Sequence, residues 1–245
     1  MISSFGTLYG IGVGPGDPEL MTVKGASLLG ECRHVFVPKA RTEANSLALS
    51  IAKTYLPEHA VIHELVFPMS ADEEELSAHW RKNANEIDEI LQKREDACFI
   101  TLGDPFLYST FIYLVRELRQ LRPGAQIVAI PGVTAFSAAA SLCAFPVGEG
   151  RDAVTIIPAV EDLDHIRRAL RDKGTVILMK IGRRLRETID LLAEEGVIDG
   201  SVFVSRVGMA DQRIETDLRT LRDAAPETGY LSIILVHAKG GGETR

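Results

Sequence analysis

The chain of 245 residues has few cysteines and no excess of positive charge. Its three cysteines, Cys32, Cys98 and Cys143, form no CxxC pair. An odd number of widely spaced cysteines does not fit a disulfide framework, so we expect free thiols in a reducing cytoplasm. Lys and Arg number 27 against 34 Asp and Glu, which gives a net charge of −7. Because duplex nucleic acid and anionic membranes both attract a concentrated basic face, we expect neither as a partner.

Long apolar segments and the common catalytic motifs are also missing. The longest apolar stretch, residues 129–148, is interrupted by proline and glycine, so it is not expected to span a membrane. The start of the chain has no basic segment followed by an apolar one, which argues against a signal peptide. There is no Gly-x-Ser-x-Gly motif. His59 and His63 stand beyond Pro57 in a strand-like segment, so they make a poor metal pair. We therefore predict a cytoplasmic protein without a metal site.

The sequence does contain apolar runs of strand length that alternate with segments of helical period. This pattern predicts an α/β fold whose first half holds a largely parallel sheet. Late in the second half, expected strands follow one another with little room for helices, so we predict a mixed sheet there. A turn-rich break at residues 121–125 predicts two α/β domains, residues 1–120 and 124–245. The expected strands are residues 8–13, 35–37, 61–66, 98–102, 126–130, 153–157, 175–179, 202–207, 212–218 and 231–237, and the expected helices are residues 22–31, 44–55, 72–94, 110–121, 134–143, 163–171 and 185–195.

The first of three unusual loops, residues 9–18, follows the first expected strand. It has a glycine at every second position from residue 10 to residue 16, so side chains are absent where the backbone turns. Every register of the dinucleotide motif GxGxxG fails, because Pro15, Asp17 or Glu19 stands where the last glycine is required. The loop either admits a ligand or packs tightly against neighbouring backbone.

Two further loops also follow apolar strands. In residues 101–110, Asp104 is able to accept hydrogen bonds from a ligand or to close its own turn beside Pro105. Residues 130–140 pass through Pro-Gly into a helix of small residues, whose N-terminal amides are able to bind ligand oxygens. Alternatively, the small residues serve helix–sheet packing, and Thr134 is the N-cap of the helix.

Basic residues gather after two of the expected strands. They are Lys39 and Arg41 after one strand, and Lys180, Arg183, Arg184 and Arg186 after the other. Cations in the first turn of a helix oppose the helix dipole by a few tenths of a kcal/mol each. The second cluster therefore indicates either an anionic ligand or an ordinary solvated surface.

Together these motifs resemble those of the tetrapyrrole methylases, and in particular the branch that methylates carbon 20 of precorrin-2. The resemblance rests on YGIGVGPGDPELMTVKG at residues 9–25, VFVPK at 35–39, SLA at 46–48, FPM at 67–69, LGDPFLYSTF at 102–111, IPGVTA at 130–135 and VILMK at 176–180. It runs from about residue 6 to at least residue 180. Thr134 stands where the branch often has serine, and it keeps the hydroxyl.

The resemblance implies two α/β domains of the tetrapyrrole methylase type, with mixed sheets and an active-site cleft between them. It implies S-adenosyl-L-methionine (SAM) as the cofactor, a homodimer, and methyl transfer to carbon 20 of precorrin-2 or cobalt-factor II in cobalamin (vitamin B12) biosynthesis. The sequence does not separate the metal-free substrate from the cobalt-containing one.

The resemblance also implies site residues. Those implied to bind the cofactor are Gly103, Asp104, Phe106, Tyr108, Thr134, Ala135, Met179, Val207 and Ser232. Those implied to border or bind the substrate are Tyr9, Gly14, Pro15, Gly16, Lys39, Arg183 and Arg184, with Arg41 and Arg206 as further partners for its carboxylates. No side chain is identified as the acceptor of the proton that leaves carbon 20.

Three alternative functions stay open. A sister methylase of the corrin pathway would act on another ring carbon. An oxidoreductase would need the dinucleotide motif that fails in the first loop. A tetrapyrrole carrier or chelatase would need convergent His and Glu side chains, which the sequence does not offer.

Overall fold

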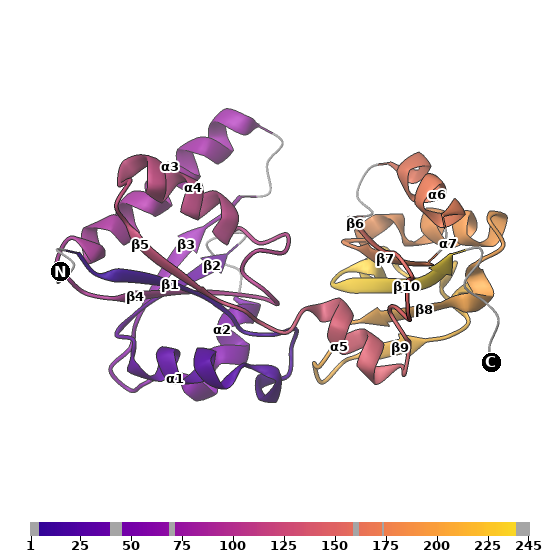
Figure 1. Cartoon of the computed structure of the whole chain (residues 1–245), viewed down its shortest axis with the longest axis horizontal. Helices are drawn as coiled ribbons and strands as arrows, with labels where there is room; N and C mark the ends of the chain where they lie inside the picture. Colours follow the sequence, from indigo (N-terminus) through magenta and orange to yellow (C-terminus); the bar gives the residue numbers. More distant parts are fainter. Residues whose placement is uncertain (1–4, 40–45, 69–71, 159–161, 173, 239–245) are drawn as a thin grey trace. The chain divides into compact units, whose positions relative to one another are not determined.

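The chain divides into two compact units, Met1–Thr134 and Ala135–Arg245, each with one five-stranded sheet (Figure 1). The structure is a computed structural model that describes residues 5–39, 46–68, 72–158, 162–172 and 174–238. The division falls later than the boundary predicted at residues 120–124. The reason is that residues 126–130 pair in parallel with the first strand and so belong to the first sheet.

The sheet of unit 1 is wholly parallel, with the strand order β3-β2-β4-β1-β5. Its strands are β1 (Thr7–Gly12), β2 (His34–Lys39), β3 (Val61–Val66), β4 (Ala97–Thr101) and β5 (Gln126–Ile130). Its helices are α1 (Val23–Glu31), α2 (Leu47–Ala52), α3 (Glu73–Leu91) and α4 (Phe111–Leu121), with 3-10 turns at Pro18–Leu20 and Lys53–Tyr55. All five residues of the central strand β4 are buried.

Helices cover both faces of this first sheet (Figure 1). Leu29 of α1 and Ile51 of α2 pack in one apolar cluster with strand residues such as Ile100. Ile87 of α3 and Leu114 of α4 belong to a second cluster, which covers the other face. Because all five strands run the same way, their carboxyl ends share one edge of the sheet. Ligands of such sheets bind beyond that edge.

The sheet of unit 2 is mixed, as the closely spaced strands predict, with the order β6-β7-β10-β8-β9. Strands β6 and β7 are parallel and the other neighbours are antiparallel. The strands are β6 (Val154–Pro158), β7 (Gly174–Met179), β8 (Ser201–Ser205), β9 (Arg213–Glu215) and β10 (Ser232–Ala238). The helices are α5 (Ala135–Leu142), α6 (Leu163–Arg171) and α7 (Leu185–Glu194), with 3-10 turns at Gly182–Arg184, Ile198–Gly200, Leu218–Leu221 and Pro226–Gly229.

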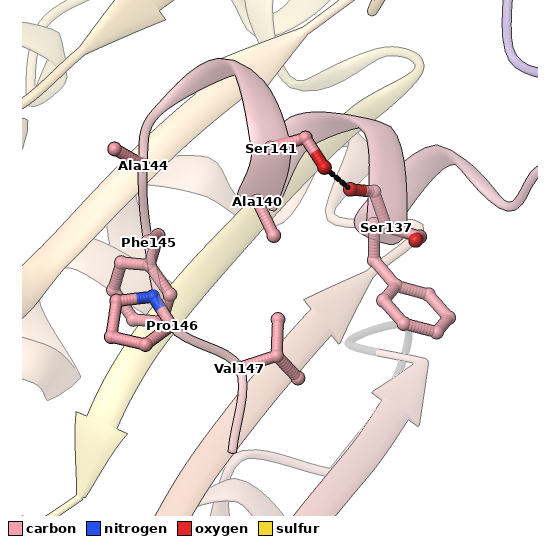
Figure 2. A pocket seen from close by; sticks show the side chains of 8 residues that line it. Ser137, Ala140, Ser141, Ala144, Phe145, Pro146 and Val147 are labelled. Atoms are coloured by element: carbon pink, nitrogen blue, oxygen red, sulfur yellow. Dashed lines mark hydrogen bonds between the residues drawn. The ribbon is translucent and has the colours of Figure 1, made fainter. Parts of the chain in front are cut away.

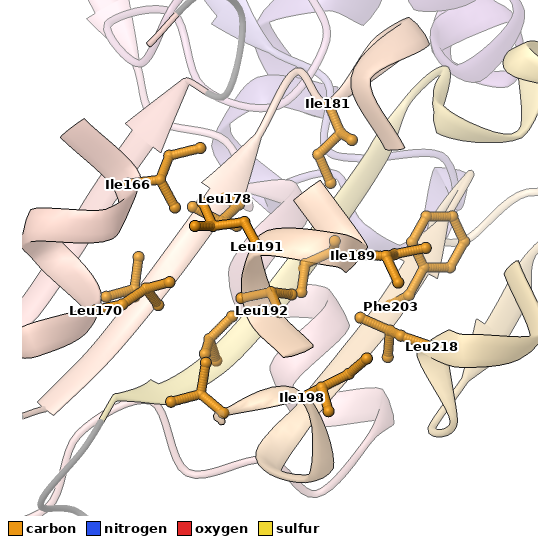
Figure 3. Close-up of a cluster of buried hydrophobic side chains, with 14 of the residues drawn as sticks. Ile166, Leu170, Leu178, Ile181, Ile189, Leu191, Leu192, Ile198, Phe203 and Leu218 are labelled. Carbon is orange, nitrogen blue, oxygen red and sulfur yellow. The ribbon is translucent and has the colours of Figure 1, made fainter. Parts of the chain in front are cut away.

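A single large apolar cluster forms the core of unit 2. Leu170 of α6 and Leu192 of α7 pack against Leu178 of β7 and Phe203 of β8 (Figure 3). The strand predicted at residues 212–218 is shorter than expected. Only its middle pairs with β8, because Leu218 turns into the same core on a 3-10 turn.

None of the helices in the described ranges combines the length and the apolar composition that crossing a bilayer requires.

Candidate functional site

In unit 1, the three glycine-containing loops meet where β1, β4 and β5 end. The amide of Gly103 donates to the carbonyl of Gly14 over 2.8 Å. A Cβ atom on Gly12 would lie 2.4 Å from the carbonyl oxygen of Gly103, and one on Gly132 would lie 2.0 Å from the same oxygen. The backbones approach so closely that no side chain fits at residues 12 and 132. Gly12 of the first loop therefore serves tight backbone packing, one of the two roles expected for that loop.

Asp104 ties the second loop to the third. Its Oδ1 accepts a hydrogen bond from the amide of Phe106 over 2.8 Å, and its Oδ2 accepts one from the amide of Gly132 over 3.1 Å. Both carboxylate oxygens are thus engaged by backbone amides of the protein. This geometry supports the turn-forming role of Asp104 and extends it to a neighbouring loop.

The backbone beside this tie is buried, but there is room for an atom next to Gly103. Gly103 has a φ of +68°, and a Cβ atom placed on it would meet no atom within 4 Å. Phe106 and Tyr108, also implied to bind the cofactor, are 53% and 39% exposed. The second loop therefore combines two exposed aromatic side chains with unfilled space beside Gly103.

In unit 2, three residues implied to bind the cofactor lie at one edge of the sheet. Met179 ends β7, Ser232 begins β10, and Val207 follows β8 by two residues. Strand β10 runs antiparallel between β7 and β8, so these ends come together. The Ser232 hydroxyl donates to the carbonyl of Gly229 over 2.7 Å, which leaves that side chain engaged within the protein.

The backbone of Val207 is buried without a partner. The residue is only 2% exposed, yet no described residue is hydrogen-bonded to its amide or its carbonyl. Buried backbone polar groups are nearly always paired, because leaving one unpaired costs free energy. An unpaired buried amide and carbonyl at this edge are suited to contacts with a polar ligand.

Strained backbone occurs at or beside several of the residues implied to bind the cofactor. Six non-glycine residues in the described ranges have a positive φ: Arg94, Tyr108, Ala144, Lys180, Arg206 and Leu231. Arg94 and Ala144 lie in the turns that close α3 and α5, where this conformation is ordinary. The other four lie at, or directly beside, residues implied to bind the cofactor. This conformation costs roughly 1–2 kcal/mol per residue, and such strain tends to occur at functional sites.

The basic residues implied to meet the substrate are partly engaged in ion pairs. Lys39, at the end of β2, lies 2.6 Å from Glu64, and its side chain is only 11% exposed. The Nε atom of Arg184 lies 2.7 Å from a carboxylate oxygen of Glu187. Arg183 is exposed and forms no ion pair with any residue that the structure describes. Arg41 lies outside the described residues.

Four other expected positions differ in their surroundings. Tyr9 lies in the middle of β1 and packs against the core of unit 1, away from the loops at the strand end. Pro15 is buried. Thr134 is the last residue of unit 1, and Ala135 is the first residue of unit 2.

A hollow of about 540 Å³ lies beside α5 in unit 2 (Figure 2). Apolar side chains such as Phe136 and Val147 form most of its lining. The hydroxyl of Ser141 donates to the carbonyl of Ser137 over 3.1 Å. None of the residues implied to bind cofactor or substrate lines this hollow.

Leu231 has a backbone conformation that the sequence does not predict. Its carbonyl accepts a hydrogen bond from the amide of Arg206 over 3.0 Å, and its φ is +52°. No sequence signal marks a leucine in this conformation, because glycine or asparagine is the usual residue there.

The sequence matches a known protein family over most of its length. The family described as tetrapyrrole (corrin/porphyrin) methylases matches residues 7–222. The chain belongs to this family. Its loops at residues 9–18, 101–110 and 130–140 all lie within the match.

Two curated relatives and one solved structure illustrate the likeness. The chain is 33% identical over 232 residues to a cobalt-precorrin-2 C(20)-methyltransferase of Salmonella typhimurium, covering 95% of this chain and 96% of that protein. It is 29% identical over 238 residues to a precorrin-2 C(20)-methyltransferase of Sinorhizobium, covering 94% and 95%. A uroporphyrin-III C-methyltransferase of Thermus thermophilus, solved with S-adenosylhomocysteine, shares the fold with a TM-score of 0.65 at 19% identity, covering 95% of this chain and 97% of that one.

Proposed function

We propose that the chain transfers a methyl group from SAM to carbon 20 of precorrin-2 or of cobalt-factor II, in cobalamin biosynthesis. The observation that carries the proposal is the likeness, over nearly the whole chain, to relatives named for this reaction. One of these relatives is named for cobalt-precorrin-2 and the other for precorrin-2. Both substrates are therefore to be tested.

Two features of the described residues fit SAM, which has a polar amino-acid part and a polar adenosine. The space beside the backbone of Gly103 holds no protein atom within 4 Å of the Cβ position. The buried amide and carbonyl of Val207 have no hydrogen-bond partner among the described residues and are able to pair with polar groups of a ligand. We propose that both serve the cofactor, together with Met179, Thr134 and Ala135.

The reaction needs position more than acid–base strength. When bound, SAM would supply an electrophilic methyl group on its sulfonium for in-line attack by a ring carbon of the electron-rich macrocycle, with S-adenosylhomocysteine as the leaving group. Placing the two reactants correctly supplies as much as roughly 7–11 kcal/mol of the barrier. The glycine loops suit this task, because backbone hydrogen bonds and close backbone approach hold them to one another. No proton acceptor for carbon 20 is assigned.

The substrate carries several acetate and propionate groups, so it needs local positive charge on a chain of net charge −7. We propose Lys39, Arg183 and Arg184 for this role. Arg183 is exposed and unpaired among the described residues, so it is the most available of the three. Lys39 and Arg184 would have to exchange or share their present carboxylate partners, Glu64 and Glu187.

We further propose that the protein works in the cytoplasm as a homodimer. The family resemblance supports the dimer, and the absence of a CxxC pair among its three cysteines fits a reducing compartment. Analytical ultracentrifugation of the purified chain tests the dimer directly.

The function is tested by ligand binding and by methyl incorporation. SAM at about 100 times its dissociation constant is expected to stabilise the fold by about 2.7 kcal/mol, and NAD is expected to have no effect. Radiolabelled SAM is then incubated with precorrin-2 or with cobalt-factor II, and label is expected in one or both tetrapyrroles. Stabilisation by NAD alone, or no label in either substrate, would contradict the proposal.

A further inference from the structure

Strands β7 and β8 of unit 2 end in the same kind of turn. The first turn is Lys180-Ile181-Gly182 and the second is Arg206-Val207-Gly208. The basic residues have φ values of +56° and +53°, and the glycines have φ values of +53° and +75°. The middle residues, Ile181 and Val207, are 1% and 2% exposed. The two turns, termed here the twin turns, thus repeat one order of residue types and one backbone conformation.

A long basic residue at the first position of such a turn costs free energy, because its backbone has a positive φ. Glycine avoids the strain, and asparagine tolerates it better than a long side chain does. Arg94 also has a positive φ, but it closes helix α3, where the carbonyl end of the helix dipole favours a cation. Lys180 and Arg206 follow strands, so no helix end explains them. The positive charge itself then accounts for the long side chains at these two positions.

The twin turns present their cations at one edge of the sheet. Strand β10 lies between β7 and β8, so Lys180 and Arg206 are two strand spacings apart, about 10 Å. Lys180 is exposed. The side chain of Arg206 is 38% exposed, and its Nε atom lies 2.6 Å from Oδ2 of Asp211 without hydrogen-bond geometry. The same edge carries Met179, Val207 and Ser232.

We propose that Lys180 and Arg206 bind two separate carboxylates on the rim of the tetrapyrrole. This inference rests on the proposed function, since it assigns residues to that substrate. A macrocycle with acetate and propionate groups on neighbouring pyrroles presents several carboxylates at its edge. Two basic side chains carried by strand ends about 10 Å apart suit two of them. Ammonium and guanidinium groups make strong charge-assisted hydrogen bonds to carboxylates. The pair thereby sets how the macrocycle is oriented.

The variants Lys180→Asn and Arg206→Asn test the inference without adding backbone strain. Each is expected to raise KM for the tetrapyrrole about tenfold, since a hydrogen bond to a charged group contributes roughly 1.5–3 kcal/mol. The double variant is expected to raise KM nearly a hundredfold, because the free-energy effects of substitutions at separated sites add. The dissociation constant of SAM is expected to stay within twofold of wild type, and the thermal midpoint to equal or exceed it.

Arg94→Asn is the matched control, because it makes the same change at a basic residue with a positive φ in unit 1 and is expected to leave KM unchanged. Arg206→Lys, which keeps the charge, is expected to avoid most of the increase in KM that Arg206→Asn causes. An unchanged KM in the double variant would overturn the inference while leaving the proposed function intact. Weaker SAM binding with an unchanged KM would also overturn it, because the turns would then serve the cofactor. If the wild-type chain methylates neither substrate, the proposed function itself fails.

Discussion

Asp104 offers the sharpest test of how the glycine loops are held. Its two oxygens accept hydrogen bonds from the amides of Phe106 and Gly132. The bond to Gly132 is partly buried and charge-assisted, so it contributes about 1.5 kcal/mol, and the exposed bond to Phe106 contributes about 0.5 kcal/mol. Asp104→Ala is therefore expected to lower the free energy of unfolding by about 2 kcal/mol. For a chain of this size, that lowers the thermal midpoint by roughly 4–8 °C.

The same variant is expected to weaken SAM binding about tenfold. The loops would have to be reordered when the cofactor binds, and ordering one backbone residue costs about 1–2 kcal/mol. Asp104→Asn keeps one acceptor oxygen, so its effects are expected to be intermediate. Urea denaturation measures the stability, and isothermal titration calorimetry measures the affinity.

A matched control separates this role from ordinary capping. Asp72 also accepts two backbone amide hydrogen bonds, from Glu74 and Glu75, at the start of α3. Asp72→Ala is expected to cost about 1 kcal/mol and to leave SAM affinity unchanged. If Asp104→Ala keeps wild-type stability but loses affinity, the carboxylate contacts the cofactor directly. If it keeps both, the tie between the loops contributes nothing, and the reasoning fails.

Three further predictions follow from the same structure. Gly132→Ala is expected to lower the free energy of unfolding by about 3 kcal/mol or more, because its Cβ would overlap the carbonyl of Gly103. Gly103→Ala is expected to lower it by about 1 kcal/mol, from the positive φ alone. Equal losses of unfolding free energy in urea denaturation would contradict this. Burial, aided by the charge of His34, lowers the pKa of His63 below 6.5. The unfolded chain therefore binds a proton more readily there, so stability is expected to fall as the pH drops below about 6.5, and His63→Gln is expected to flatten this dependence in urea midpoints measured across that range. Arg183→Glu is expected to raise KM for the tetrapyrrole at least tenfold with little change in kcat, and an unchanged KM would remove Arg183 from the substrate site.

Much of the fold is predictable because its signals are local. Strands β3 and β5 match the residues expected for them, since each is an apolar run bounded by turn residues. The unit boundary is not predictable in this way. Strand β5 follows the turn-rich break at residues 121–125, yet it pairs with β1, more than a hundred residues earlier. A pairing between distant segments leaves no mark in the local pattern.

The candidate site also depends on contacts between distant segments, which the local sequence pattern does not reveal. The three glycine loops are visible as motifs, and the structure brings them together at one sheet edge. The tie from Asp104 to Gly132 and the positive φ of Leu231 depend on contacts between segments, so composition alone does not reveal them. Tyr9 stands in the quoted family motif, but the strand continues past it and places it against the core.

The central claim is that this chain methylates carbon 20 of the macrocycle. The direct measurement is incubation with SAM carrying a 13C-labelled methyl group and with precorrin-2 or cobalt-factor II, followed by NMR of the purified product. The account predicts a single labelled methyl group on carbon 20 in the substrate that is accepted. A labelled methyl group on any other ring carbon would contradict it and would identify a sister methylase of the corrin pathway instead.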